Sequence, residues 1–508
     1  MSHLLGIDIG TSATKALILS HSGKVVATAS QPHELLSPKP GWFEQDPQGW
    51  GLAACQAVKA AMRKAKLKKE DIEAIGLSGQ MHGSVFLDEK GRIVRHALLW
   101  NDQRTADQSK AIIEAAGGEK KILKMTGNLP LTGYTAPKIL WLKENEGKKW
   151  ARVSNVVLPK DYIRFRLTGD FATDVGDASG TALFDVKKRK WSSELIELLK
   201  LDEALFPQVY ESTEVTGVLH SEAAAAMELN EGTPVVAGSG DVMTGAIGNG
   251  ITEAGLVNAA LGTSGVMCAF SDKPAIDKEG RLATMCHAVP GKYVVFGCML
   301  SAAGSLQWYA DQLGEKTVGK KGDVFGKLMK LAEKSPAGAN GTLFMPYLTG
   351  ERCPHNDPDA RGGWIGVTRR TEEADLVRSL VEGVTFGMND MLRIMRDELE
   401  LPVKQIRATG GGSQSTLWRQ MQADVYGTPI ALMSSEEGAA YGAALLAGVG
   451  SGAFKSIDAA CKSKIKPKST IKPKAKDADC YAKQYDIYTK LYGNLHERFD
   501  ELATAYAG

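Results

Sequence analysis

An aspartate followed by a short glycine and hydroxyl turn stands near the start of the chain, and this pattern can bind phosphate. Asp8 ends an apolar run, and Gly10, Thr11 and Ser12 follow it. A turn of this composition lets backbone N–H groups and two hydroxyls converge on an anion. Asp8 would then hold Mg²⁺ that bridges phosphate oxygens. A plain hairpin with a solvated aspartate explains the same residues, and the local sequence leaves both interpretations open.

The same turn occurs again in the second half of the chain. Gly262, Thr263 and Ser264 separate two apolar runs within 256–270. Two copies of one strand–turn–strand unit, about half of the chain apart, suggest duplicated domains. Two phosphate-binding turns from two such domains would grip a nucleoside triphosphate. A match of three residues can also arise because many hairpin turns favour these residue types. The repeat is therefore evidence for duplication only together with the motifs around it.

A second acid, Asp241, ends the segment 234–241, in which a buried-strand pattern runs into a Gly-Ser-Gly turn. An acid in that place can accept a proton from an alcohol nucleophile. It can also cap the helix that the pattern at 242–246 predicts, which is a common role for aspartate. Both roles remain open from the local sequence.

Two polar clusters that follow apolar strand patterns suit a polyhydroxylated ligand. Met81 and His82 come after the strand pattern at 72–79. Met81 offers a polarisable apolar surface to a ligand, and His82 offers a ring that can form hydrogen bonds. Trp100 and Asn101 end another apolar run. A buried sugar needs such a mixture because an unmade hydrogen bond is costly. A strand-end histidine is also common as a structural residue, and that alternative stays open.

Three consecutive glycines, Gly410, Gly411 and Gly412, stand with Ser413 after a strand-like run at 406–409. Glycines allow the backbone to approach a flat group such as adenine or ribose closely. The same residues can form a flexible loop, so the run is a candidate nucleotide site only in context.

Composition excludes several classes of protein. The 508 residues carry 61 Lys and Arg against 59 Asp and Glu, a net charge of +2, and 43% of them are hydrophobic. This composition is typical of a soluble globular protein, and the charge gives no reason to expect nucleic acid or an anionic membrane as partner. No segment of about 20 apolar residues predicts a membrane span, and the first residues lack the basic region of a secretory signal. We expect a cytoplasmic protein.

The sequence also lacks the motifs of other common enzyme classes. It contains no Walker phosphate loop, no Gly-x-Ser-x-Gly nucleophile elbow and no His-Glu-x-x-His zinc motif. Its seven cysteines form no Cys-x-x-Cys pair, which predicts free thiols in a reducing compartment. The sequence therefore does not favour an enzyme of the P-loop, α/β-hydrolase or zinc-protease class.

The elements that must position these residues are those of an α/β protein. The runs 4–10, 13–20 and 24–30 are separated by short turns and predict an antiparallel three-stranded meander. A helical pattern at 47–66 and a further strand at 72–79 follow. The opening is therefore a meander and not a βαβ unit.

Near the end of the chain, the stretch 462–476 is basic and interrupted by prolines. We expect an exposed connection there, with a polybasic interaction tail as the alternative. After it, Tyr481, Tyr485, Tyr488 and Tyr492 fall at helical spacing. Such spacing predicts the packing stripe of a terminal helix.

Taken in order along the chain, these motifs resemble the FGGY family of carbohydrate kinases. Residues 133–145, with Thr135, Lys138 and Trp141 at fixed spacings, fit that family's first signature. Further segments resemble the xylulokinase branch of the family: GQMHG at 79–83, LLWNDQR at 98–104, LPKDY at 158–162, LGTSG at 261–265 and PYLTGER at 346–352. The resemblance covers nearly the whole chain and is weakest after residue 450.

The resemblance implies an α/β fold of two actin-like (ribonuclease-H-like) domains with a catalytic cleft between them. It implies a sugar-binding domain over 1–250 and a nucleotide-binding domain over 251–508. The implied activity is ATP-dependent phosphorylation of a ketopentose, with D-xylulose as the expected substrate and D-xylulose 5-phosphate as the product. Mg²⁺ is the expected metal because ATP is the expected co-substrate.

The family's site residues carry over to matching positions of this chain. Asp241 matches the general base, and Asp8 matches an acid that acts near Mg²⁺. The expected substrate-binding residues are Met81, His82, Trp100, Asn101 and Asp241. The expected nucleotide-binding residues are Thr11, Ser12, Gly262, Thr263, Ser264, Gly410, Gly411, Gly412 and Ser413.

One position departs from the family pattern. Xylulokinase-type sequences commonly carry an amide residue after the base, where it contacts sugar hydroxyls, and this chain has Val242. Valine cannot make that hydrogen bond. The choice of sugar is therefore open, while the phosphoryl-transfer residues are unaffected.

Three alternative functions remain. The first is a kinase for ribulose, another ketose or glycerol, which Val242 keeps open. The second is an actin-like ATPase that acts on a protein partner, although Met81 and His82 would have no purpose there. The third is a non-catalytic sugar sensor, which does not explain Asp8 and Asp241 together. A homodimer is compatible with the resemblance, but the sequence predicts no oligomeric state.

Overall fold

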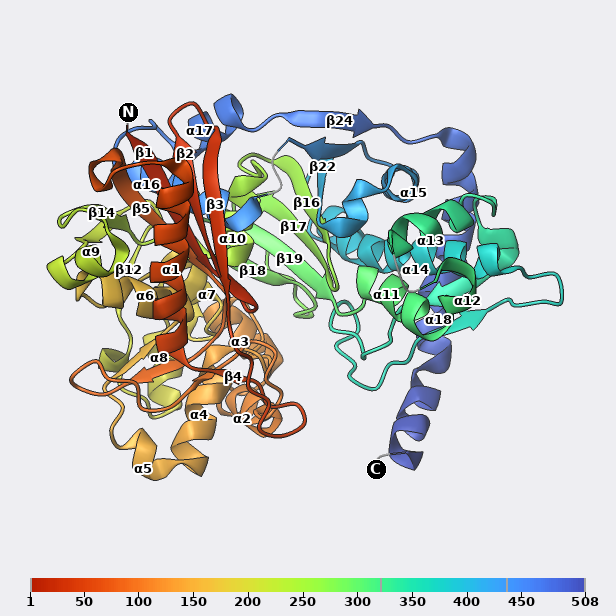
Figure 1. Ribbon diagram of the computed structural model, residues 1–508. Coiled ribbons are helices and arrows are strands. Elements are labelled where there is room, and N and C mark those ends of the chain that lie inside the picture. The colour runs from red at the N-terminus through yellow and green to blue at the C-terminus, as the bar shows by residue number, and fades with distance from the viewer. Residues whose placement is uncertain (1, 320–321, 435–436, 507–508) are drawn as a thin grey trace. The chain divides into compact units, whose positions relative to one another are not determined.

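The computed structural model describes residues 2–319, 322–434 and 437–506. The chain forms two compact units, each drawn in Figure 1. The first unit comprises Met1–Glu253, Phe270–Val294 and Glu437–Lys466, and the second comprises Ala254–Ala269, Val295–Glu436 and Pro467–Gly508. The predicted division into 1–250 and 251–508 stays a prediction, and the structure adds that residues 270–294 and 437–466 pack with the first unit.

The first unit has a mixed central sheet with the strand order β13-β14-β5-β1-β2-β3, and β15 also pairs with β5. The strands of this sheet are β1 (His3–Ile9), β2 (Ala13–Ser20), β3 (Val25–Pro32), β5 (Ile72–Gly79), β13 (Val215–Val218), β14 (Pro234–Val236) and β15 (Ser239–Gly240). The shorter strands are β4 (Glu44–Gln45), β6 (Val85–Leu87), β7 (Ala97–Leu98), β8 (Asn155–Val157), β9 (Ala172–Asp174), β10 (Phe184–Asp185), β11 (Lys190–Trp191), β12 (Gln208–Tyr210) and β18 (Ala283–Cys286). The helices are α1 (Pro47–Ala65), α2 (Ala106–Ala115), α3 (Glu119–Thr126), α4 (Thr135–Asn145), α5 (Gly147–Trp150), α6 (Pro159–Thr168), α7 (Val175–Ser179), α8 (Ser193–Leu198), α9 (Ser221–Met227), α10 (Asp241–Gly248), α16 (Gly438–Gly450) and α17 (Ile457–Lys464).

The predicted meander is confirmed, and its register brings the two candidate acids to one edge of the sheet. β1 and β2 pair antiparallel, as do β2 and β3, while β5 lies parallel to β1 on the other side. Asp8 is the register partner of Ser78 on β5, and Gly240 on β15 is the partner of Gly79. Because these parallel strands end together, Asp8 and Asp241 flank the end of β5.

Helix α1 forms as its sequence predicts. Asp46 caps the helix by accepting a hydrogen bond from the backbone N–H of Gln48, and a proline follows at the first helical position. The helix ends at Lys66, which adopts a left-handed conformation. Its apolar face, which includes the buried Trp50 and Val58, belongs to the core of the first unit.

Helix α16 packs against β1, β5 and α10 with backbone in direct contact. A Cβ atom added to Gly76 would lie 1.9 Å from the carbonyl oxygen of Ala443, and one added to Gly442 would lie 1.9 Å from that of Thr244. Small residues are therefore required on both sides of this interface. The interface also fixes α10, whose first residue is Asp241.

We expect Gly76→Ala to destabilise the protein by about 3 kcal/mol, because the added methyl overlaps backbone that cannot move aside. Urea unfolding followed by circular dichroism measures this change. Gly51 of α1 has no heavy atom within 4 Å of an added Cβ. Gly51→Ala should therefore leave stability equal or higher, since alanine favours helix. Equal losses in both variants would contradict the packing argument.

The second unit repeats this kind of sheet, with the order β19-β17-β16-β22-β23-β24. Its strands are β16 (Gly255–Leu261), β17 (Gly265–Ser271), β19 (Tyr293–Met299), β20 (Leu343–Met345), β21 (Gly363–Ile365), β22 (Val403–Thr409), β23 (Ile430–Met433) and β24 (Pro467–Ile471). Its helices are α11 (Ala303–Gln312), α12 (Glu315–Val318), α13 (Val324–Ala332), α14 (Glu373–Arg393), α15 (Thr416–Tyr426) and α18 (Ala475–Ala505). The boundary between the units falls inside β17 and β19.

The strand pairing confirms that the two Gly-Thr-Ser turns occupy equivalent places. β16 pairs antiparallel with β17 through the turn at 262–264 and lies parallel to β22 on its other side. β1 has the same two relations, to β2 and to β5. Each turn therefore joins the first two strands of a sheet and lies beside the end of a parallel strand.

The basic stretch near the end of the chain is largely exposed, as expected, but it contains a strand that the sequence did not predict. Its first residues end α17, and Pro467–Ile471 form β24, which pairs antiparallel with β23. Lysine and proline are typical of an exposed edge strand. Helix α18 follows and confirms the predicted terminal helix, with Tyr481 and Tyr488 buried.

Two further expectations concern the whole chain. All seven cysteines are free thiols, as predicted. Among the described residues, we find no helix with the length and apolar character needed to cross a membrane.

Candidate active site

Asp8 and Asp241 are linked through a chain of buried hydroxyls in the first unit. Ser78 donates a hydrogen bond from Oγ to Oδ1 of Asp8 over 2.8 Å. The same Oγ lies 2.7 Å from Oγ1 of Thr244, on the first turn of α10. Ser78 therefore joins the carboxylate of Asp8 on β1 to the helix that begins with Asp241.

Burial raises the pKa of both acids above the ordinary range. Burial raises the pKa of Asp8, although the hydrogen bond from Ser78 and the charge of Lys15 act against it. Burial raises the pKa of Asp241 to about 7, and the negative charge of Asp8 adds to this effect. A carboxylate with a pKa near the working pH is suited to accept a proton. Gly240 occupies the N-cap of α10, so Asp241 is its first residue and not the cap.

The turn after Asp8 is fixed by a network of uncharged side chains. Thr11 accepts a hydrogen bond on Oγ1 from Nε1 of Trp100 (2.9 Å) and donates to Oε1 of Gln80 (3.3 Å). Its carbonyl oxygen accepts from Nε2 of Gln45 (2.7 Å). The hydroxyl of Thr11 is thus occupied, whereas Ser12 is exposed.

The predicted sugar-contacting pair lies at the end of β5. Met81 and His82 are both buried, and His82 has a left-handed backbone with φ of +65°. The ring of His82 donates from Nδ1 to the carbonyl oxygen of Gly180 over 2.6 Å. It stacks on Tyr134 with ring centroids 4.3 Å apart. These contacts fix the ring in one orientation, as a residue that orients a ligand requires.

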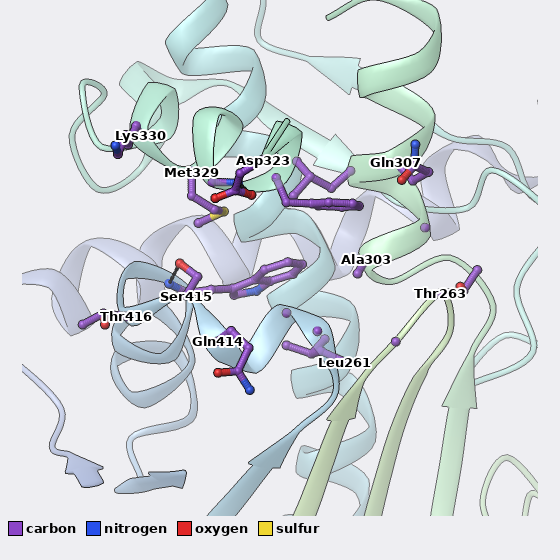
Figure 2. A pocket seen from close by; sticks show the side chains of 18 of the residues that line it. Leu261, Thr263, Ala303, Gln307, Asp323, Met329, Lys330, Gln414, Ser415 and Thr416 are labelled. Atoms are coloured by element: carbon purple, nitrogen blue, oxygen red, sulfur yellow. Dashed lines mark hydrogen bonds between the residues drawn. The ribbon is translucent and has the colours of Figure 1, made fainter. Parts of the chain in front are cut away.

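In the second unit, the repeated turn and the glycine run line one pocket of about 780 Å³. Figure 2 shows Thr263, Gln307, Asp323 and Gln414 around it. Its volume lies in the usual range for small-molecule sites. Its walls are apolar where Leu261, Leu306, Met329 and Trp418 lie, and backbone is accessible at Gly262, Gly304, Gly411 and Gly412.

Three predicted nucleotide residues of the second unit do not line this pocket. A Cβ added to Gly410 would lie 2.4 Å from the carbonyl oxygen of Leu261, so the glycine lets the two turns approach each other. Ser413 is buried and donates from Oγ to the carbonyl oxygen of Gly410 over 2.7 Å. Ser264 is likewise outside the lining residues. The assignment of all these residues to a nucleotide stays a prediction.

Comparison with known proteins decides the family. Residues 3–248 match the N-terminal domain of the FGGY family of carbohydrate kinases, and residues 257–451 match its C-terminal domain. The chain belongs to the FGGY family. It is therefore an ATP-dependent sugar kinase with the two-domain fold of that family, and the predicted resemblance is confirmed.

Individual FGGY kinases resemble this chain over nearly its full length. A xylulose kinase of Bacillus subtilis is 35% identical over 97% of both chains. The crystal structure of a xylulose kinase from Brucella ovis is 35% identical, covers 97% of this chain and 99% of its own, and has a TM-score of 0.89. A gluconate kinase from Lactobacillus acidophilus is 26% identical, with a TM-score of 0.90 and coverage of 99% of both chains. Overall fold therefore does not distinguish sugar substrates within this family.

Two buried lysines of this FGGY kinase were not predicted as site residues. Lys138 donates from Nζ to the carbonyl oxygens of His82 (2.9 Å) and Gly133 (2.7 Å). Lys160 lies under the turn that precedes Asp241 and donates to the carbonyl oxygen of Ala237 (3.1 Å). Both lysines are 0% exposed. The only sequence signal was their place inside the segments that resemble the family, 133–145 and 158–162.

Asn101 has a buried side-chain oxygen, Oδ1, that makes no hydrogen bond within the described part of the chain. Such atoms are rare in proteins because an unpaired buried acceptor costs free energy. A hydroxyl group of a bound sugar would supply the missing donor.

Proposed function

We propose that this kinase transfers the γ-phosphoryl group of ATP to the C5 hydroxyl of D-xylulose, which gives D-xylulose 5-phosphate and ADP. The observation that carries the proposal is the near-full-length similarity to proteins named xylulose kinase. The paired acids Asp8 and Asp241, and the polar residues around them in the first unit, supply the groups that this reaction needs.

Asp241 acts as the general base. The C5 hydroxyl of the sugar is a far weaker acid than a carboxylic acid, so the proton moves late, as the phosphoryl group is captured. The hydroxyl oxygen forms the new bond to phosphorus, the bond from phosphorus to the bridging oxygen of ADP breaks, and the proton goes to the carboxylate of Asp241. Before that moment the carboxylate orients the hydroxyl.

Asp8 fits a divalent metal, and we assign Mg²⁺ to it. Oxygen ligands from carboxylates are those that Mg²⁺ prefers. The carboxylate of Asp8 has one oxygen paired with Ser78, and burial raises its pKa, which a nearby cation would reverse. Mg²⁺ bound there would neutralise charge on the phosphate oxygens of ATP.

Met81, His82, Trp100 and Asn101 form the sugar site, and the pocket of the second unit holds the nucleoside. His82 presents a fixed ring, and Asn101 presents an unpaired acceptor. In the pocket of the second unit, glycine backbone can approach ribose and phosphate closely, and Trp418 and Met329 offer an apolar surface to the nucleobase.

Val242 favours one alternative, a related kinase for another ketose or polyol. The test is a comparison of kcat/KM for D-xylulose, D-ribulose, gluconate and glycerol, measured as sugar-dependent formation of ADP. We expect the highest value for D-xylulose. A higher value for any other compound would overturn this substrate, and an ATPase rate independent of all four would overturn the sugar-kinase mechanism.

The base also predicts a pH dependence. Asp241 accepts a proton only when it is ionised, so activity is lost as the pH falls through the pKa of about 7. Below that value, kcat/KM should fall by about tenfold per pH unit. A profile from pH 5.5 to 8.5 measures this limb. An activity that stays constant down to pH 5.5 would remove Asp241 from the role of base.

A further inference from the structure

A fully buried charge cluster lies below the turn that carries Asp241. Lys160, at the start of α6, is surrounded by three aspartates, Asp161, Asp174 and Asp177, and all four side chains are at most 1% exposed. Nζ of Lys160 forms an ion pair with Asp161 and lies 3.2 Å from Asp174 and 3.8 Å from Asp177. Burial opposes the charge of Lys160, but the three carboxylates raise its pKa above the ordinary value. The lysine therefore stays charged.

The cluster makes direct hydrogen bonds to both ends of the turn at 237–240. Lys160 donates to the carbonyl oxygen of Ala237 over 3.1 Å, where the turn begins. Asp174 accepts on Oδ2 from Oγ of Ser239 over 2.7 Å, two residues before Asp241. Gly238, between these two points, has φ of +73°, and an added Cβ would lie 2.2 Å from the carbonyl oxygen of Leu77. The turn is therefore held at each of three successive residues.

The same lysine supports the neighbouring sugar-binding segment. An added Cβ on Gly79 would lie 3.2 Å from Cβ of Lys160, so the end of β5 rests on this side chain. Met81 and His82 follow within three residues. One buried cluster thus lies below both strand ends from which the proposed site is built.

Stability gives no reason for this cluster. Burying a lysine with three acids carries a large desolvation cost, and well-packed apolar residues in place of buried ions are often neutral or stabilising. Both carboxylate oxygens of Asp177 lack a hydrogen-bond partner among the described residues. The charged side chains instead form hydrogen bonds of defined direction with the turn at 237–240. The position of this turn determines where Asp241 lies.

We infer that Lys160 and Asp174 are positioning residues, which set the place of the Asp241 carboxylate through the turn at 237–240. They act through Ala237 and Ser239 and do not contact substrate. The inference rests on the proposed role of Asp241 as the base.

Two serines allow a matched test. Ser239 and Ser212 are both 0% exposed, and each donates from Oγ to the same oxygen, Oδ2 of Asp174, over 2.7 and 2.9 Å. Ser239 lies in the turn that carries Asp241, whereas Ser212 lies in a neighbouring segment, where its backbone carbonyl oxygen accepts a hydrogen bond from the N–H of Gly238. Ser239→Ala and Ser212→Ala each remove one side-chain hydrogen bond to the same oxygen of Asp174, and both keep this backbone bond. Only the first variant breaks a bond between the cluster and a side chain of the turn.

We expect Ser239→Ala to lower kcat by roughly tenfold, because a misplaced base loses orientation, with KM for the sugar within twofold of the parent. Ser212→Ala should keep kcat within twofold. Asp174→Asn, which retains the side-chain shape, should give the same loss of kcat without a change of KM, and it replaces Ser239→Ala should that variant not fold. Thermal unfolding of each variant shows that the fold is intact.

Equal kcat values in the two serine variants, whether both lowered or both unchanged, would overturn the inference, since a purely structural bond has the same effect from either side. Asp241→Asn, assayed in parallel, distinguishes failure of the base role of Asp241 from failure of the positioning role of Lys160 and Asp174. If Asp241→Asn keeps full turnover, the proposed function fails. If Asp241→Asn is inactive while the serine variants behave alike, only the positioning role fails.

Discussion

We expect Asp241→Asn to lower the turnover of sugar by at least about a hundredfold, with the affinities for ATP and sugar nearly unchanged. Asparagine has the same shape as aspartate and can still accept a hydrogen bond from the hydroxyl, so binding persists. It cannot take up the proton. Steady-state kinetics with binding measured separately by calorimetry distinguishes a lower kcat from weaker binding.

Asp177 provides a matched control for this substitution. It is another fully buried aspartate of the first unit, and the charge of Asp241 contributes to its pKa. Burial raises the pKa of Asp177 well above the ordinary value, with Lys160 acting against this. Asp177 belongs to the buried cluster around Lys160, but its carboxylate makes no hydrogen bond to the turn at 237–240, so Asp177→Asn should lose much less turnover than Asp241→Asn. A parent-like rate in Asp241→Asn, or an equal loss in Asp177→Asn, would contradict the base assignment.

Asp8→Ala should lower kcat/KM for Mg·ATP by roughly a hundredfold, because the carboxylate that holds Mg²⁺ is lost. The affinity for the sugar should change much less. Titration of Mg²⁺ at fixed ATP, together with the KM for the sugar, measures both effects.

Loss of the hydroxyl bridge is the competing explanation, and Ser78→Ala tests it. This variant breaks the links from Ser78 to Asp8 and Thr244 but keeps the carboxylate. We expect a loss well below that of Asp8→Ala. If Ser78→Ala reproduces the full effect, or if Asp8→Ala damages sugar affinity as much as the use of Mg·ATP, the turn has collapsed and the metal role is wrong.

The elements that the sequence predicted correctly are those with local signals. Asp8 and Asp241 each follow a short apolar run, and such runs become strands whose ends carry functional groups. The two Gly-Thr-Ser turns are similarly local, since a hairpin depends on its own few residues. For this reason the meander, the repeated hairpin and helix α1 agree with the structure.

The residues that the sequence did not place depend on distant partners. Lys138 and Lys160 lie in helices where a lysine normally faces solvent, and their burial follows from the carbonyl oxygens of His82 and Ala237 and from Asp174. Likewise, no pattern near Gly76 indicates that Ala443 of α16 will pack on it. Non-local packing overrides local propensity in these places.

Val242 concerns the identity of the sugar substrate, which neither the sequence nor the overall fold determines. It stands next to the proposed base, where it cannot donate or accept a hydrogen bond, and a gluconate kinase shares the overall fold with a TM-score of 0.90. We propose that the choice between sugars depends on a few polar contacts, such as those of His82 and Asn101.

The most direct measurement compares two deoxy sugars as phosphoryl acceptors. The account predicts that 1-deoxy-D-xylulose, which keeps the C5 hydroxyl, is phosphorylated with one ADP formed per sugar phosphate. It predicts that 5-deoxy-D-xylulose yields no sugar phosphate by mass spectrometry. Phosphorylation of the 5-deoxy compound, or equal ADP formation without either sugar, would contradict transfer to the C5 hydroxyl.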